Sequence, residues 1–225
     1  MTLRPFFALL MSIALLLSAC SNSDDDPVLV VPASTAAPTV TNAPIAAPAT
    51  TIIERTTLFA GPAPAATADC PAGLLDANSS VSTVGLDEVR FGMTIGQAQE
   101  AAQICLVAEG ESARECHYVR PVGGPDGVGF MVTEGTIERV DVIAGGVTTR
   151  SGAGVGTTEQ QILDLFGSKI EARPSPTGDG KWLLFIPTDI DDKAFRVIWE
   201  IDDAGETTQF RSGRLPQVEW ANGCP

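Results

Sequence analysis

The sequence predicts an α+β domain of two tandem units, each a helix followed by an antiparallel meander, placed after a disordered tether. The first observation is a repeated motif, because Gly-x-Thr-x-x-Gln-apolar occurs at Gly92–Ala98 and again at Gly156–Ile162, an offset of 64 residues. The second is that alternating apolar patterns typical of strands follow both copies. These observations place the domain at 70–225, with one unit at about 86–145 and the other at about 150–218.

The chain begins with a segment typical of a bacterial export signal. Arg4 precedes an apolar core from Phe6 to Leu17, about 12 residues long, whereas a membrane span needs about 20. The segment ends in Leu17-Ser18-Ala19-Cys20, which resembles the lipobox, where the cysteine thiol receives a diacylglycerol and the peptide is cut just before it. We therefore predict a signal peptide at 1–19 and a lipidated Cys20, the alternative being an ordinary signal peptide with a chance cysteine. Its acyl chains would anchor the protein on the extracytoplasmic side of the cell membrane.

Residues 20–69 have the composition of a tether. Ala, Pro and Thr dominate, large apolar residues are few, and repeated proline favours extended backbone. At about 3.1 Å per residue the tether could reach about 150 Å when extended. It therefore predicts a domain held clear of the lipid surface.

The domain that follows is acidic, which argues against a nucleic-acid partner. Residues 70–225 contain 23 acidic and 12 basic residues, a net charge of −11, and the basic residues form no run. Such a surface repels the phosphates of nucleic acid and anionic lipid. We therefore expect no nucleic-acid partner.

Four cysteines lie in the domain, an even number in a chain predicted to be exported to an oxidising compartment. Cys105 and Cys116 flank a polar loop, and Cys70 and Cys224 lie at the two ends of the domain. Of the three possible pairings we therefore predict Cys105 with Cys116 and Cys70 with Cys224. A zinc site is the alternative, but no two cysteines have finger-like spacing and the only histidine is His117, so we expect no metal.

Both copies of the repeated motif predict the start of a helix. Thr94 and Thr158 stand where an N-cap is needed, and Gln97 and Gln161 follow at the capping-box position. Apolar residues then recur at spacings of three and four, as expected for a helix that packs on a sheet. They are Ile95, Ala98, Ala101, Ala102 and Cys105 in the first copy, and Ile162, Leu165 and Phe166 in the second.

Strand patterns account for most of the remaining domain. A hairpin is predicted at Thr133-Glu134-Gly135, between two apolar runs. The predicted strands are 116–119, 128–132 and 137–143 after the first helix, and 169–173, 181–186, 194–201 and 207–213 after the second.

Three segments carry a resemblance to a known family: "FGMTIGQAQEAA", "GPDGVGFMVTEGTIERVDV" and "TRSGAGVGTTEQQILDLFG". They resemble the BLIP/BamE-like (β-lactamase-inhibitor-protein-like) superfamily, and more closely its uncharacterised secreted or lipid-anchored actinobacterial proteins. The resemblance covers about Leu86 to Gly213. It implies the tandem fold and a habit of binding proteins on a sheet face. Cys105 and Cys116 match the first cysteine pair of the inhibitor fold. The second unit lacks its own pair, and this difference from the inhibitor fold argues against inhibitor activity.

The sequence offers little for catalysis. His117 stands beside a cysteine in a strand pattern, and no Gly-x-Ser-x-Gly or Ser-x-x-Lys motif supplies a nucleophile. Glu200 and Asp202, and the acidic run 189–192, are typical of turns and lack the pattern of a calcium loop. We therefore predict no catalytic residue and no cofactor.

Strand alternation suggests a binding face. In 195–201, Phe195, Val197, Trp199 and Ile201 share one face, which we expect to pack on the second helix, while Arg196 lies on the other. In 181–186 both faces are apolar, so one of them must be exposed or covered by a partner. We predict that the face with Trp182 is exposed, because Trp tolerates a wet edge, and the alternative is that Trp182 fills the core. The candidate contacts, chosen because aromatic and arginine side chains dominate protein hot spots, are Trp182, Arg196, Tyr118 and Arg120.

The sequence thus predicts a lipid-anchored extracytoplasmic protein-binding module in the cell envelope. Its partner would be another envelope or secreted protein, engaged in envelope assembly or through inhibition. The alternatives are a non-catalytic structural envelope lipoprotein and a hydrolase of unknown substrate.

Overall fold

The computed structural model describes residues 61–67, 69–70, 72–110, 115–178 and 180–225. The predicted signal peptide, Cys20 and the tether up to residue 60 lie outside the described residues. In the part that is described, no helix is both long and apolar enough to cross a membrane.

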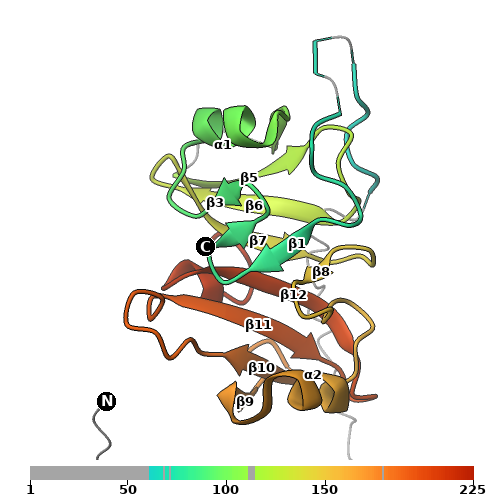
Figure 1. Cartoon of the computed structure of the whole chain (residues 1–225), viewed down its shortest axis with the longest axis vertical. Coiled ribbons are helices and arrows are strands. Elements are labelled where there is room, and N and C mark those ends of the chain that lie inside the picture. The colour runs from blue at the N-terminus through green and yellow to red at the C-terminus, as the bar shows by residue number, and fades with distance from the viewer. Residues whose placement is uncertain (1–60, 68, 71, 111–114, 179) are drawn as a thin grey trace, which may run out of the picture. The chain divides into compact units, whose positions relative to one another are not determined.

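A large antiparallel sheet of eight strands forms the centre of the domain (Figure 1). In order across the sheet, its strands are β4 (Leu106–Glu109), β5 (Cys116–Pro121), β6 (Val128–Thr133), β7 (Thr136–Val142), β12 (Thr207–Arg214), β11 (Phe195–Ile201), β10 (Lys181–Phe185) and β9 (Ile170–Pro174). The strands predicted from alternation all appear, within one or two residues of their expected bounds.

A second, small sheet has four short strands. They are β3 (Val89–Arg90), β2 (Gly85–Leu86), β1 (Ser80–Ser82) and β8 (Thr148–Thr149), in that order. β1 and β8 run parallel, whereas the other pairs are antiparallel. Parallel neighbours need a long connection, and here it contains the whole first half of the large sheet.

Two short helices begin where the repeated motif predicts them. α1 (Ile95–Ala102) follows Thr94 and α2 (Glu159–Phe166) follows Thr158. Each threonine side chain accepts a hydrogen bond from the amide three residues on, and that glutamine side chain accepts from the threonine amide, so both capping boxes are confirmed. A 3₁₀ turn, η1 (Gly167–Lys169), continues from α2.

The predicted hairpin between β6 and β7 is also confirmed. Thr133 pairs with Thr136, which leaves Glu134 and Gly135 as a two-residue turn. Their φ angles are 52° and 82°. Positive φ at both central residues is the type I′ pattern, which matches the twist of antiparallel strands.

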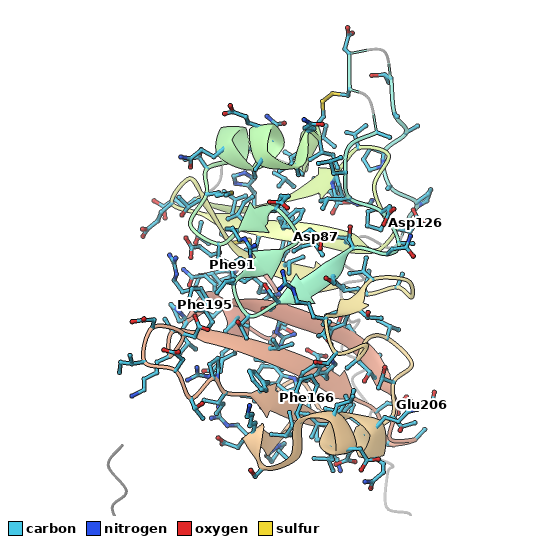
Figure 2. All side chains as sticks on the ribbon, in the orientation of Figure 1. Asp87, Phe91, Asp126, Phe166, Phe195 and Glu206 are labelled. Carbon is cyan, nitrogen blue, oxygen red and sulfur yellow. A yellow bond between two sulfur atoms is a disulfide. The ribbon has the colours of Figure 1, made fainter. Side chains whose placement is uncertain are left out.

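The helices and the small sheet cover one face of the large sheet. Figure 1 shows α1 and α2 at opposite ends of the domain, with the small sheet between them. Their buried residues and that face of the large sheet form a single apolar core. Phe91, next to the small sheet, stacks on Phe195 of β11 with ring centroids 6.1 Å apart, and Figure 2 shows the two side by side.

The predicted α+β class is wrong. In the described residues two helices of eight residues each stand against twelve strands, so the domain is mostly β. The two expected tandem helix-plus-meander units do not form separately, because β7 pairs with β12 and joins all eight long strands in one sheet. The small sheet was missed because strands of two or three residues are too short to show an alternation.

The predicted disulfide pairing is also wrong. The structure joins Cys70 to Cys105 and Cys116 to Cys224, with sequence separations of 35 and 108. The polar loop was expected to bring Cys105 to Cys116, but its first residues form β4, which pairs with β5 so that Leu106 faces Pro121. Cys105 and Cys116 therefore lie at opposite ends of this ladder, about 20 Å apart at about 3.4 Å per residue, too far for a bond.

The C-terminal segment 215–225, which we call the strap, crosses the other face of the large sheet. It contains a 3₁₀ turn, η2 (Gln217–Glu219), and ends at the disulfide between Cys224 and Cys116 of β5. Val218 packs in a buried cluster with Trp182, Leu184 and Ile198. The sheet is therefore covered on both faces, by helices and the small sheet on one and by the strap on the other.

Candidate functional site

Arg139 of β7 holds the strap with a fully bonded guanidinium. Nε and NH2 donate to the two carboxylate oxygens of Asp141, at 2.8 and 2.7 Å, and NH2 also donates to the hydroxyl of Tyr118 at 2.9 Å. NH1 donates to the carbonyl oxygens of Gln217 and Trp220, at 2.8 and 2.7 Å. The guanidinium itself is withdrawn from water, because the Arg139 side chain is 1% exposed. Arg139 therefore links the sheet to two strap carbonyls.

Arg211 of β12 repeats this role nearer to β10. It pairs with Glu200, and its Nε donates to the carbonyl of Val218 at 2.8 Å. Its guanidinium carbon lies 4.4 Å from the centre of the Trp182 ring, a cation–π distance. Burial, with the charge of Arg139, lowers the pKa of Arg211. Two arginines and two carboxylates thus form a neutral buried network that fixes the strap.

The predicted exposed binding face is therefore wrong. Trp182 is 5% exposed because Val218 of the strap covers it. Tyr118 and Arg120 are also buried, and Arg120 bonds to Glu109 and to the carbonyl of Gly61. Arg196 is half-buried, with its NH1 bonded to the carbonyls of Lys193 and Phe195. These side chains share a sheet face, but the strap covers much of it, and Gly61 contacts it at Arg120.

Tyr118 gives this buried network a spectroscopic probe, because it is the only tyrosine of the chain. Burial, with the negative charge of Asp141, raises the pKa of Tyr118 well above the ordinary value of 10.0, and the charge of Arg139 opposes the shift only in part. We expect no tyrosinate absorbance from the folded protein at about pH 10 to 11, where an exposed tyrosine ionises.

The raised pKa of Tyr118 also determines how the stability of the protein changes with pH. The unfolded chain loses the Tyr118 proton above about pH 10 while the folded chain keeps it, so this contribution to stability is complete below about pH 10 and is lost as the pH rises. Tyr118→Phe should remove that part of the alkaline decline in the free energy of unfolding. Tyrosinate absorbance at about pH 10 with unchanged circular dichroism would contradict the buried position.

A pocket with the features of a binding site lies on the opposite side of the large sheet. This aromatic pocket, as we call it, has a volume of 210 Å³ and lies where the small sheet, the C-terminal end of α2 and β10–β11 meet. Figure 2 shows Phe166 in this region, between α2 and the large sheet. The lining residues are Val81, Ser82, Thr83, Thr149, Arg150, Ser151, Phe166, Phe185, Val197 and Trp199.

Three aromatic rings, together with Val81 and Val197, form the apolar side of the pocket. The Phe166 ring centroid lies 5.4 Å from that of Phe185 and 5.2 Å from that of Trp199. Trp199 and Val197 are buried, as predicted for this face of β11, and they share the core with Ile162 of α2. Leu165 was expected in the same stripe but is 49% exposed, so the prediction for that residue is wrong.

The pocket also offers polar groups. Among the described residues, the indole nitrogen of Trp199 finds no hydrogen-bond acceptor, although the residue is fully buried. A buried N–H without a partner is costly, so Trp199 lowers the stability of the core at this position. Arg150 lies exposed in the lining, and the Lys169 ammonium is 6.0 Å from the Phe185 ring centroid.

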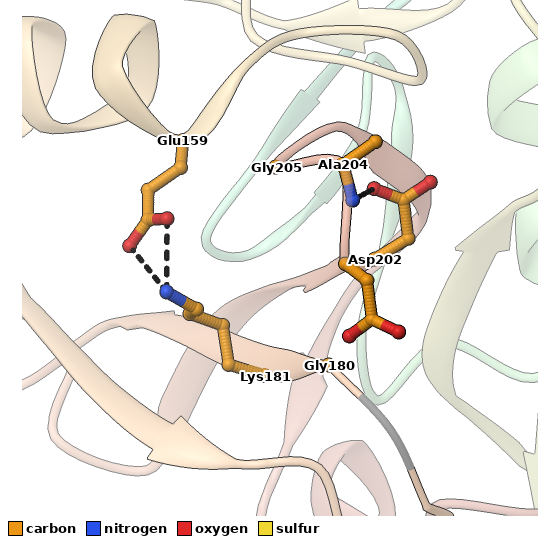
Figure 3. A pocket seen from close by; sticks show the side chains of 7 residues that line it. Glu159, Gly180, Lys181, Asp202, Ala204 and Gly205 are labelled. Atoms are coloured by element: carbon orange, nitrogen blue, oxygen red, sulfur yellow. Dashed lines mark hydrogen bonds and ion pairs between the residues drawn. The ribbon is translucent and has the colours of Figure 1, made fainter.

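A larger cavity of 380 Å³ lies by the β11–β12 turn, and three of its charged side chains, Glu159, Lys181 and Asp202, already have partners (Figure 3). Lys181 forms an ion pair with both carboxylate oxygens of Glu159, at 3.1 and 3.0 Å. Asp202 accepts hydrogen bonds from the amides of Ala204 and Glu206, so it shapes its own turn. In the described part of the chain, no group of His, Cys, Asp and Glu is arranged to hold a metal.

Sequence reasoning missed the aromatic pocket as a site. Its residues come from five separate segments, and the short strands β1 and β8, with the residues that directly follow them, supply its polar side. Phe166, Val197 and Trp199 were predicted only as core, because alternation cannot tell a filled core position from one that lines a hollow. The chain matches no protein-family model, no curated protein and no solved structure, so the resemblance to the BLIP/BamE-like superfamily stays a prediction.

Proposed function

We propose that this protein is a lipid-anchored extracytoplasmic module that binds another envelope or secreted protein. The observation that carries the proposal is the aromatic pocket, which combines three aromatic rings with an exposed arginine, Arg150. Aromatic and apolar anchors that enter such pockets supply most of the binding energy at protein interfaces. The binding site of the proposal is thus the aromatic pocket, and it replaces the face that contains Trp182.

The size of the pocket supports a protein partner over a free small molecule. Sites for drug-sized ligands have volumes of about 300 to 1,000 Å³. The aromatic pocket has 210 Å³, enough for one bulky side chain and too little for a larger molecule. A partner protein can place one anchor in the pocket and make its remaining contacts on the rim.

The two disulfides support the proposed location. Disulfides persist in exported proteins and are rare in the cytosol, where thiols are kept reduced. They join segments 35 and 108 residues apart, and the second ties the strap to the sheet. A domain stiffened in this way can present a preformed pocket at the end of the tether, which reduces the entropy lost on binding.

Site-specific photocrosslinking in cells that produce the full chain tests this proposal. A benzoylphenylalanine at Ser151, an exposed residue of the pocket, should give a discrete adduct of one partner protein. The same probe at Ile190, which is exposed and does not line the pocket, is the control. Thr83→Trp, which fills the pocket from its rim, should abolish the adduct while thermal unfolding stays unchanged. No adduct at Ser151, or an adduct that persists in Thr83→Trp, would exclude this binding site.

A further inference from the structure

We propose that the aromatic pocket recognises a bulky apolar side chain flanked by acidic residues on the partner protein. This inference deepens the proposed function, on which it rests, by stating the chemistry of the bound segment. It depends on two features of the pocket: its apolar side and the charge of its surroundings.

The apolar side selects the anchor. Phe166 and Phe185 are half-buried and stand at 5.4 Å from each other at an interplanar angle of 58°, a tilted arrangement. An aromatic side chain that enters between the rim and Trp199 can extend this tilted packing, which is favourable between rings. The volume of 210 Å³ limits the occupant to about one side chain of that size.

The charge near the pocket is opposite in sign to that of the domain. The domain has a net charge of −11, yet the basic residues Arg150 and Lys169 lie at the pocket and next to its Phe185 ring. Within the described residues neither Arg150 nor Lys169 forms an ion pair, and both are exposed. Carboxylates beside the anchor would therefore meet two available cations, while basic neighbours would be repelled by them.

Trp199 provides a signal that reports on the pocket. Its side chain lines the pocket, and its ring centroid lies 5.2 Å from that of Phe166. An aromatic occupant should therefore change the environment of the Trp199 indole and shift its N–H signal.

Peptide titration followed by nuclear magnetic resonance tests the inference. The protein is the mature chain with Cys20→Ser, labelled with ¹⁵N. The probes are three acetylated, amidated peptides: Gly-Asp-Phe-Asp-Gly, Gly-Asp-Ala-Asp-Gly and Gly-Lys-Phe-Lys-Gly. The chain has three tryptophans, so three indole N–H signals are expected, and Trp199→Phe identifies the one that reports on the pocket. The signals of Trp182 and Trp220, which pack with the strap on the other face, serve as internal controls.

The expected result is a saturable shift of the Trp199 signal with the acidic phenylalanine peptide. Replacing phenylalanine by alanine should weaken binding at least about tenfold, because an apolar side chain is no longer buried. Arg150→Ala and Lys169→Ala should each weaken the acidic peptide about twofold to fivefold, and less at high salt. Arg173→Ala is the matched control, since Arg173 is an arginine of the edge strand β9 paired with Glu171 and Glu219. It should leave affinity unchanged.

Two results would overturn the inference. One is equal or tighter binding of the lysine peptide, and the other is no shift of the Trp199 signal with any peptide. Failure of the proposed function looks different, because it removes the Ser151 crosslink as well. If the crosslink forms and depends on an open pocket while the peptides fail, the protein-binding function stands and the acidic-anchor chemistry does not.

Discussion

Arg139→Met should lower the free energy of unfolding by about 3 to 5 kcal/mol, the range for breaking a buried ion pair by removal of one partner. The substitution leaves Asp141 charged and 6% exposed, and it leaves the strap carbonyls of Gln217 and Trp220 without their donor. Urea denaturation at neutral pH measures the effect. The loss should be accompanied by faster proteolysis of the strap, because Arg139 bonds it to the sheet at two points.

A second variant separates the two causes of this loss. Arg139→Met combined with Asp141→Leu removes the uncompensated charge, and buried ion pairs can often be replaced by apolar residues with little cost. The double variant should therefore regain part of the stability but not all, since the two strap carbonyls still lack a donor. Arg173→Met, at an exposed ion pair of β9, is the control and should leave stability nearly unchanged. Equal effects of Arg139→Met and Arg173→Met would contradict the role of the network.

Cys20→Ser should abolish incorporation of a fatty-acid probe into the protein and leave the precursor uncleaved by the lipoprotein signal peptidase. Only the thiol of Cys20 can receive the diacylglycerol at the predicted cleavage site, and serine offers no equivalent nucleophile to the lipid-transfer enzyme. The variant therefore lacks the acyl chains, which would contribute about 0.8 kcal/mol per buried methylene to membrane anchoring.

Two measurements check this prediction. Metabolic labelling with an alkyne fatty acid reports lipid directly, and immunoblotting distinguishes the precursor from the cleaved protein by size. Ser21→Ala, next to Cys20, is the matched control and should keep both the label and the cleavage. Persistent labelling of Cys20→Ser would show that this cysteine is not the lipid acceptor, and the proposed anchor would have to be abandoned.

The sequence by itself determined the local elements of this protein. Thr94 and Thr158 were recognised as N-caps because a capping box needs only groups three residues apart. Glu134-Gly135 was recognised as a hairpin turn for the same reason, since two residues between alternating runs are enough. The long strands, such as β11, could be placed because alternation is a property of neighbours along the chain. Alternation alone could not place Trp182, because both faces of 181–186 are apolar.

Only the tertiary structure decided how these elements combine. The pairing of β7 with β12 converted two expected units into one sheet, and β4 moved Cys105 and Cys116 to opposite ends of a ladder, which changed both disulfides. The strap buried Trp182, whereas the junction of α2, β10, β11 and the small sheet left a hollow beside Trp199. Each outcome depends on contacts between residues far apart along the chain, whose free energy comes from burying surfaces against each other. A sequence pattern within one segment carries no information about which distant residues will cover that segment.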